Sequence, residues 1–505
     1  MRTLLLALGL PILAAVAHAD NVLITNARVY DGGGAPARAV DVRVRGDRIV
    51  AVAPALSAGR HEAVRDAHGL ALAPGFIDMH SHGDRGLLKD LDAATISRQG
   101  VTMILVGQDG DSNFPLRDFF GRLASTPAAI NVASMIGHAT LREQAMGKDL
   151  YRPSTAAELS AMKTLLASEL AAGAFGLSTG LEYERGHFAT TEEVIELSKV
   201  AARAGGFYIS HVRNEAERTF ESFDEVLAIG RGAHLPVEIT HIKLGATSIW
   251  HQASRRMPGY FATARRDHVE LRADVYPYTF WHSTIRVLIA DRDYFNPTKV
   301  EQALTENGGP TAIRISRYRP DPTLAGKTLE QFASAWRVSP VEAYMRVVRE
   351  TEAEAAGGEP LEAVDVSSMS EDDVRWFVAQ PNIMFSSDGE LHGSHPRGAG
   401  AFPRVLGLYV RELHTLPLPL AIHKMTGLSA AALGLKDRGC IAAGCVADLV
   451  LFDPLTVRDQ ATIDDPEAAP TGIPAVMVNG EWVIDDGKVT GRHPGRVVRP
   501  TARAR

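Results

Sequence analysis

The sequence predicts an α/β fold: a (β/α)8 barrel of the TIM type, with a small composite β-domain formed from both termini. Two observations carry this prediction. The centre of the 505-residue chain alternates apolar strand-like segments with helical segments, and eight such strands can be counted. Both ends are rich instead in short alternating strands separated by glycine turns. A chain of this length, 45% hydrophobic, can form more than one domain.

Residues 1–19 have the pattern of a secretory signal peptide. Arg2 precedes an apolar stretch, and Ala17-His18-Ala19 fits the small-x-small rule for cleavage. We therefore expect a periplasmic or secreted protein. No other segment is long and apolar enough to cross a bilayer, so we expect no membrane span after the signal is removed.

Residues 20–73 and 436–505 are expected to form the β-domain together. The first part contains short strands between 22 and 54, and turns at Gly32-Gly33-Gly34 and Gly46-Asp47 separate them. The second part repeats this style between 447 and 485. Two separate appendages would each have a meagre core, which favours one composite domain.

Residues 74–435 are expected to form the barrel. Its first strand contains Phe76 and Ile77, and the others are predicted at 101–106, 131–136, 173–178, 207–210, 237–240, 271–275 and 382–386. Helical segments such as 155–172 and 191–204 lie between several of them. The long gap at about 285–380 indicates an insertion over the active-site mouth.

Charge and cysteine content narrow the range of partners. The formal net charge is −7, and no run of Lys and Arg resembles a nucleic-acid footprint, so no nucleic-acid partner is expected. Cys440 and Cys445 are the two cysteines. A disulfide between them is one alternative in an oxidising compartment, but two small buried residues are favoured. A zinc site there would need two further ligands that nothing nearby supplies.

A histidine pair at the end of the first strand indicates a metal site. His80 and His82 are two residues apart, so on a strand both imidazoles face the same side. A lone His-x-His often arises by chance. Here, however, His211, His241 and Asp388 follow the fifth, sixth and eighth predicted strands. The carboxyl ends of barrel strands meet at one face, so this set predicts a divalent-metal centre.

These motifs resemble the amidohydrolase superfamily, and more closely the D-aminoacylase (N-acyl-D-amino-acid deacylase) family. The matching segments are Pro-Gly-Phe-Ile-Asp-x-His-x-His, Gly-Ala-Phe-Gly-Leu-Ser-Thr-Gly, Ser-His-x-Arg-Asn-Glu, Thr-His-Ile-Lys, Asp-x-Tyr-Pro-Tyr, Ser-Ser-Asp-Gly and Ala-Asp-Leu-Val-x-Phe-Asp. The resemblance covers about residues 22–485. It implies zinc, one or two ions, and hydrolysis of an amide beside a free carboxylate. It also implies metal-ligand roles for His80, His82, His211 and His241, and the role of general base for Asp388, which we also expect to contact the metal.

The chain departs from the family at one ligand. Many D-aminoacylases carry a cysteine in a Gly-Asn-Cys-Gly turn after the second strand, where this chain has Gly107-Gln108-Asp109-Gly110. Other members of the superfamily use a carboxylated lysine on the fourth strand, where this chain offers Glu182. Zinc accepts carboxylate oxygen. Glu182 is therefore the favoured anionic ligand, and Asp109 is the competitor because it stands in place of the cysteine.

The predicted substrate is a small molecule with a free carboxylate. Lys243 lies two residues beyond His241, and Arg397 follows Asp388 on a loop that could fold over the mouth. The resemblance adds Tyr276, because residues at these three positions hold the substrate carboxylate in the family.

The favoured function is a zinc-dependent amidohydrolase that cleaves N-acyl-D-amino acids, with Asp388 moving the proton. One alternative is an exported metallo-dipeptidase for dipeptides that contain a D-residue or a β-linkage. An inactive metal-binding scaffold is another. The carboxylate-binding set argues against a cyclic-amide hydrolase of the dihydropyrimidinase kind. The preferred side chain, the stereochemistry and the oligomeric state stay open.

Overall fold

The computed structural model describes residues 21–289, 291–352 and 360–501. The predicted signal peptide, 1–19, lies outside the described residues. Among the helices of the described part, none is both long and apolar enough to span a membrane.

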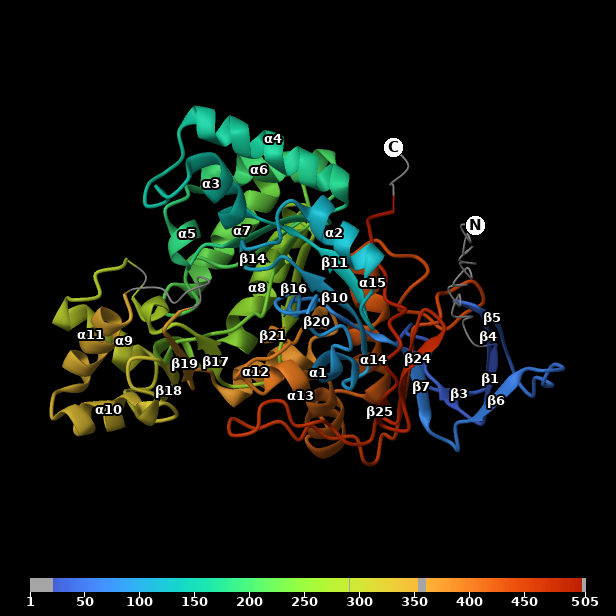
Figure 1. The fold of residues 1–505 in the computed structure, drawn as a ribbon. Helices are drawn as coiled ribbons and strands as arrows, with labels where there is room; N and C mark the ends of the chain where they lie inside the picture. Colours follow the sequence, from blue (N-terminus) through green and yellow to red (C-terminus); the bar gives the residue numbers. More distant parts are fainter. Residues whose placement is uncertain (1–20, 290, 353–359, 502–505) are drawn as a thin grey trace, which may run out of the picture.

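The prediction of a (β/α)8 barrel is confirmed (Figure 1). The strands, all parallel, are β8 (Phe76–Asp78), β10 (Val101–Val106), β11 (Asn131–Ser134) continued by β12 (Ile136–Gly137), β13 (Gly176–Gly180), β14 (Phe207–His211), β15 (Val237–Ile239), β16 (Leu271–Val275) and β20 (Ile383–Phe385). Short strands beyond β8 and β20 bring the first and last strands together: β9 (Ser81–His82) pairs in parallel with β21 (Gly389–Glu390).

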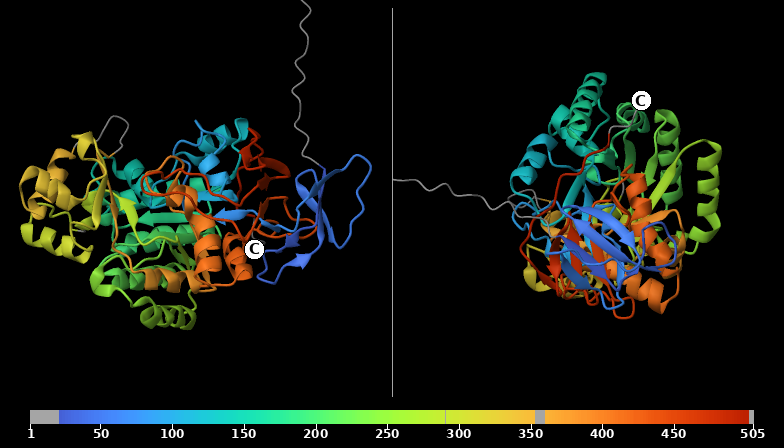
Figure 2. Two further views of the ribbon diagram at one scale, coloured as in Figure 1. Left: turned by 90° about the horizontal axis from the view of Figure 1, so that it is seen from below. Right: turned by 90° about the vertical axis from the view of Figure 1, so that its right-hand side faces the viewer.

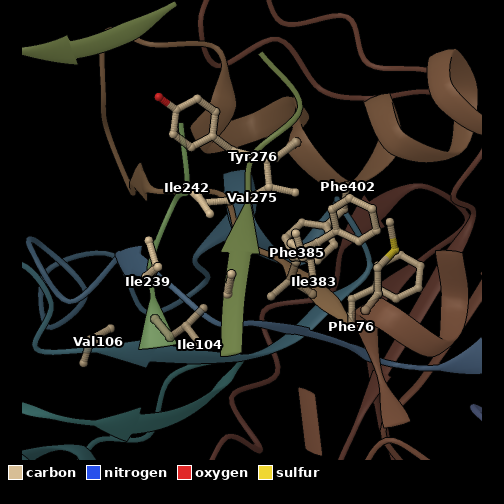
Figure 3. Packing of buried hydrophobic residues seen from close by; sticks show 14 of the residues in the cluster. Phe76, Ile104, Val106, Ile239, Ile242, Val275, Tyr276, Ile383, Phe385 and Phe402 are labelled. Carbon is tan, nitrogen blue, oxygen red and sulfur yellow. The ribbon is translucent and has the colours of Figure 1, made fainter. Parts of the chain in front are cut away.

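The barrel strands are apolar because both of their faces are buried, as is usual in parallel sheets. One core contains Ile104 and Val106 of β10, Ile239 of β15, Val275 of β16 and Phe385 of β20 (Figure 3). The helices that surround the strands are α1 (Ala94–Ser97), α2 (Leu116–Ser125), α3 (His138–Met146), α4 (Ala156–Ala172), α5 (Glu184–His187), α6 (Thr191–Arg203), α7 (Thr219–Ala233), α8 (Ala253–Arg266), α12 (Glu371–Ala379), α13 (Arg397–Arg404), α14 (Leu418–Met425) and α15 (Gly427–Ala432). A π-helical segment, Val405–Glu412, continues α13, and a 3-10 turn, Thr247–Ile249, precedes α8.

The insertion lies between β16 and β20 and has its own apolar core. Its antiparallel sheet has the order β17 (Trp281–Ser283), β19 (Glu362–Val366), β18 (Ile313–Tyr318). Its helices are α9 (Pro297–Glu306), α10 (Leu329–Trp336) and α11 (Pro340–Glu350), with 3-10 turns at Ile285–Leu288 and Pro322–Leu324. Helix α12, inside the predicted 285–380 span, packs on the barrel instead, because its apolar face contributes Val374, Phe377 and Val378 to the barrel core.

The β-domain draws strands from both ends of the chain and lies at the opposite end of the barrel from the insertion (Figures 1 and 2). One sheet has the order β5 (Arg48–Ala53), β4 (Asp41–Arg45), β1 (Val22–Thr25), β6 (Ala63–Asp66). The other has the order β25 (Lys488–Val489), β24 (Glu481–Asp485), β23 (Ala475–Val478), β22 (Leu449–Phe452), β7 (Ala71–Pro74), β2 (Arg28–Val29), β3 (Arg38–Ala39). A shared apolar core joins the two sheets.

The expectation for the cysteines was wrong, because Cys440 and Cys445 form a disulfide. Gly444, at φ 94°, turns the chain back on itself. The two Cα atoms are therefore only 6.2 Å apart, within the range that a disulfide spans. Their spacing in the sequence does not reveal this turn.

Candidate active site and metal centre

The four histidines lie together at the carboxyl face of the barrel, where the sequence places them. His80 and His82 follow β8, His211 ends β14, and His241 follows β15. All four are buried, and His80 has no exposed surface. Because parallel strands end at one face, residues that are far apart in the sequence meet here.

One ring nitrogen of His80, which follows β8, contacts Thr240, and the other is directed toward His82. Its Nδ1 lies 2.6 Å from the Thr240 hydroxyl, while its Nε2 lies 3.2 Å from the Nε2 of His82. Histidines that bind metals usually bond a protein group through the second nitrogen, which fixes the ring and its tautomer. Thr240 therefore acts as an orienting group for His80.

His211 and His241 have the same arrangement. The Nε2 of His211 lies 2.9 Å from a Glu182 oxygen, and the Nδ1 of His241 lies 3.1 Å from a Glu215 oxygen. The opposite nitrogens, His211 Nδ1 and His241 Nε2, are 3.3 Å apart. Each of these rings thus presents one nitrogen to a carboxylate and one to its neighbouring histidine.

Asp109 lies between the two histidine pairs. One of its oxygens is 3.3 Å from His82 Nε2, and the other is 3.4 Å from His241 Nε2. Burial opposes ionisation of this carboxyl, but the charges of His80 and His241 hold its pKa well below the usual range. Asp109 is therefore an anion that faces both pairs.

Glu182, the favoured anionic ligand, occupies a different place. Its carboxylate contacts the outer nitrogen of His211 and accepts a hydrogen bond from the Glu215 backbone N–H at 3.1 Å. The structure therefore brings Asp109, and not Glu182, between the histidine pairs. Asp109 reaches this place from a tight turn in which its own φ is 56°.

Asp388 joins the histidine cluster and a cation. Its Oδ1 lies 3.3 Å from His80 Nε2 and 3.4 Å from His82 Nε2, while its Oδ2 lies 2.7 Å from the guanidinium of Arg397. Burial disfavours the charged form, yet Arg397 and the histidines hold the pKa of Asp388 well below its usual range. Asp388 is thus an ionised carboxylate at the cluster.

The donor atoms fit a zinc centre. Two groups of potential ligands share Asp109: His80, His82, Asp109 and Asp388 form one, and Asp109, His211 and His241 form the other. Within each group the donor atoms lie within 4.8 Å of one another. Imidazole nitrogen and carboxylate oxygen are ligands that zinc accepts, and one shared carboxylate can serve one ion or two. A third group combines Glu182, His211 and Glu215.

Two carboxyl groups beneath the cluster were not anticipated. Asp78 accepts hydrogen bonds from the backbone N–H of Ser387 at 2.8 Å and of His80 at 3.3 Å, and Asp274 accepts one from His241 at 2.9 Å. Burial raises the pKa of Asp78 to about 7. Asp78 belongs to the Gly-Phe-Ile-Asp motif, but the sequence did not show that it accepts hydrogen bonds from the backbone around the site.

The three predicted substrate-binding residues meet beside Asp388. The Lys243 Nζ lies 5.6 Å and the Arg397 Cζ 5.0 Å from the ring centre of Tyr276. Lys243 also pairs at 2.7 Å with Glu215, a residue of the Ser-His-x-Arg-Asn-Glu motif whose role the sequence did not show. All three predicted residues are buried.

A cavity of about 550 Å³ is lined by part of this site, including Lys243 and Arg397. Its inner wall includes His211, His241, Lys243, Asp388 and Arg397. Another part of the wall comes from the insertion, through 281–283, 287–289 and part of α9. The volume suits a small organic substrate.

The carboxyl face of the barrel holds a metal-ligand set beside a cavity. This combination indicates a class of protein, the metal-dependent hydrolases of the TIM-barrel type. The amidohydrolase family model matches residues 63–283 and 293–484. D-Aminoacylase of Alcaligenes xylosoxydans xylosoxydans is 37% identical over 95% of this chain and 98% of that protein. The chain therefore belongs to the amidohydrolase family, in the branch that contains D-aminoacylase.

Other relatives support the same family membership. The N-acyl-D-glutamate deacylase of the same organism is 36% identical, over 95% of this chain and 97% of that protein. A solved D-aminoacylase matches with a TM-score of 0.82 at 35% identity, over 95% of this chain and all of that one. The N-acyl-D-glutamate deacylase of Bordetella bronchiseptica, solved with zinc and a phosphonate inhibitor, matches with a TM-score of 0.83 at 34% identity, over 95% and 99% of the two chains.

Proposed function

We propose that this protein is a zinc-dependent amidohydrolase that cleaves the amide bond of N-acyl-D-amino acids. The observation that carries the proposal is the double contact of Asp388, which reaches His80 and His82 with one oxygen and Arg397 with the other. Asp388 therefore connects the metal-ligand set to Arg397, the cation proposed to bind the substrate carboxylate. The names of the D-aminoacylase and N-acyl-D-glutamate deacylase relatives support the same reaction.

The metal is proposed to be held by His80, His82, His211, His241, Asp109 and Asp388. When bound, zinc polarises the amide carbonyl and lowers the pKa of water towards about 7. Thr240, Glu182 and Glu215 hold the rings of three of these histidines in place from outside. Glu182 is therefore assigned to orientation, which replaces the expectation that it is a ligand.

Asp388 is proposed as the general base. It is ionised at neutral pH, it lies among the histidine nitrogens, and it opens onto the cavity. It accepts a proton from the attacking water and returns it to the leaving amine. Arg397 contacts its Oδ2 at 2.7 Å and thereby orients the carboxylate.

Lys243, Tyr276 and Arg397 are proposed to hold the free carboxylate of the amino-acid half. A guanidinium can bind a carboxylate through two hydrogen bonds, and an ammonium adds a point charge. Both cations also pair with carboxylates of the site, Lys243 with Glu215 and Arg397 with Asp388. Glu215 and Asp388 also contact histidines of the site, so neither carboxylate is balanced by its cation alone. Lys243 and Arg397 can therefore interact with a substrate carboxylate as well.

Export to the periplasm or the medium is proposed as well. The N-terminal pattern supports it, and the Cys440–Cys445 disulfide supports an oxidising compartment. Cell fractionation with N-terminal sequencing of the mature protein tests this. A mature protein that begins near residue 20 in the periplasmic or extracellular fraction is expected, and an intact Met1 in the cytosol would contradict it.

The reaction is tested with matched D- and L-isomers of N-acetyl amino acids, offered to zinc-loaded protein. We expect hydrolysis of the D-isomers. Dipeptides that contain a D-residue or a β-linkage form a second arm, and preferred cleavage of these would establish the dipeptidase alternative. Zinc binding without hydrolysis of any amide in either arm would refute the proposal.

A further inference from the structure

We infer that the cavity selects N-acyl-D-amino acids whose side chain is neutral or basic, and that it discriminates against acidic side chains. This rests on the proposed function and refines it. The relatives leave the question open, because D-aminoacylase, N-acyl-D-glutamate deacylase and N-acyl-D-aspartate deacylase are 37%, 36% and 36% identical to this chain. The charges that line the cavity decide it.

A substrate with an acidic side chain carries two carboxylates, and each needs a cation. Among the described residues that line the cavity, the Lys and Arg side chains are Arg213, Arg218, Lys243, Lys299 and Arg397. Lys243 and Arg397 are assigned to the carboxylate that every substrate in this class shares. Arg213, Arg218 and Lys299 are left for a second one.

Arg213 has few donors to offer. Its Nε and Nη2 donate to Glu225 at 2.9 and 2.8 Å. Its Nη1 donates to the carbonyl of His187 at 2.7 Å, and Nη2 also reaches the carbonyl of Ala189 at 3.1 Å. These bonds occupy the guanidinium and neutralise its charge, so Arg213 acts as a brace between β14 and the loop that precedes α6.

The other two cations are also paired with carboxylates, and both are open to solvent. Lys299, on α9, contacts both Asp291 and Asp293, the latter at 3.0 Å. Arg218 pairs with Glu221 at 2.6 Å on the exposed start of α7. Lys243 and Arg397 are paired as well, but their side chains are buried, whereas those of Arg218 and Lys299 are 67% and 42% exposed, so a ligand carboxylate would gain little from them.

Carboxylates exceed cations on the cavity wall. Glu217 lines the cavity, is exposed, and makes no ion pair within the part of the chain that the structure describes. Glu306 accepts a hydrogen bond from the Ser248 hydroxyl and has no cation partner among the described residues. These like charges would repel a second substrate carboxylate, and no cation would compensate the repulsion. An amide or ammonium group would not be repelled.

The insertion adds an apolar patch to the cavity wall. Trp281, Val287, Leu288 and Ile289 of the insertion line the cavity. Such a surface receives an aliphatic or thioether side chain through burial of apolar area. Together with the charges, this wall favours side chains such as those of methionine, glutamine and lysine over those of glutamate and aspartate.

The test compares two substrates of the same shape that differ in one charge, N-acetyl-D-glutamine and N-acetyl-D-glutamate. With zinc-loaded wild-type protein, we expect kcat/KM for the glutamine substrate to be at least about tenfold higher. N-acetyl-D-lysine and N-acetyl-D-methionine are expected to be cleaved too. Equal or faster hydrolysis of the glutamate substrate would overturn the inference while leaving the proposed function intact. Failure of all four substrates would overturn the proposed function itself.

The electrostatic cause is tested with Glu217→Lys, and Glu217→Gln serves as its matched control. The lysine variant is expected to lower the glutamine-to-glutamate ratio of kcat/KM by several-fold, and the neutral variant to lower it less. Higher salt is expected to reduce the wild-type ratio, because this site is open to solvent. A ratio that neither the substitutions nor salt change would refute the charge argument.

Discussion

Arg397 provides the sharpest test of how the substrate is held. The residue is only 6% exposed, and its guanidinium lies over the Tyr276 ring and contacts Asp388. Replacing it with methionine keeps most of the side-chain length and removes the charge. The substrate carboxylate then loses one of its two cations.

The expected loss follows from burial. Truncating one partner of a buried, hydrogen-bonded charge pair costs about 2–5 kcal/mol, which is a loss of about 30-fold to several thousandfold in kcat/KM. Lys243 remains on the other side of Tyr276. We therefore expect Arg397→Met to fall in the lower part of this range, at about 100-fold, when the substrate is N-acetyl-D-methionine.

The assay must separate the substrate carboxylate from Asp388, because Arg397 contacts the proposed base as well. N-acetyl-D-methionine amide has the same scissile bond and no carboxylate. Any effect through Asp388 reduces both rates equally, whereas loss of the carboxylate contact reduces only the rate for the acid. Arg397→Lys retains the charge and should recover part of the loss for the acid.

The wild-type preference for the acid over the amide should therefore collapse in Arg397→Met. If kcat/KM falls by the same factor for both substrates, Arg397 acts only through Asp388. The proposed carboxylate contact would then be refuted.

Three further predictions address the metal, the base and stability. Asp109→Asn should lower zinc affinity by at least about a hundredfold, and Glu182→Gln should lower it by about 10- to 100-fold. Competition with a chelator measures both losses. A larger loss in Glu182→Gln would reverse the assignment of Asp109 as ligand and Glu182 as orienting group. Asp388→Asn should lower kcat about 10²- to 10⁴-fold with the fold retained by circular dichroism, and unchanged turnover would eliminate Asp388 as the base. Burial raises the pKa of Glu362, in β19, to about 7 from 4.5. The folded state thus holds this proton more tightly than the unfolded state. The cost to folding therefore builds up between pH 4.5 and about 7, stays constant above pH 7 and disappears as pH falls below 4.5. Glu362→Gln should therefore stabilise the protein by about 2–3 kcal/mol at pH 8 and by less than about 1 kcal/mol at pH 5, in thermal unfolding with exposed Glu301→Gln as the control, and an equal effect at both pH values would contradict this.

The strand pattern of the barrel could be predicted because parallel strands buried on both faces leave a plain apolar signal. The expected segments at 101–106 and 271–275 have the same bounds as β10 and β16. The histidines and Asp388 could be placed because the carboxyl ends of such strands meet at one face.

Features that depend on local turns were harder to predict. Asp109 faces the histidines because of a turn with positive φ, and an aspartate in a glycine-rich turn looks the same in the sequence whether it faces inward or outward. The turn at Gly444 likewise hid the disulfide. The sequence also does not show to which part α12 belongs, because it has the apolar pattern of any amphipathic helix, and only packing shows that it covers the barrel.

The central claim is that the four histidines with Asp109 and Asp388 form a catalytic metal centre for N-acyl-D-amino acids. The most direct test is a zinc titration of metal-free protein, with hydrolysis of N-acetyl-D-methionine and zinc content followed together. We predict no turnover without metal and a rise that saturates at one or two zinc ions per chain. Turnover that persists in metal-free protein, or a zinc-saturated protein without turnover, would contradict the account.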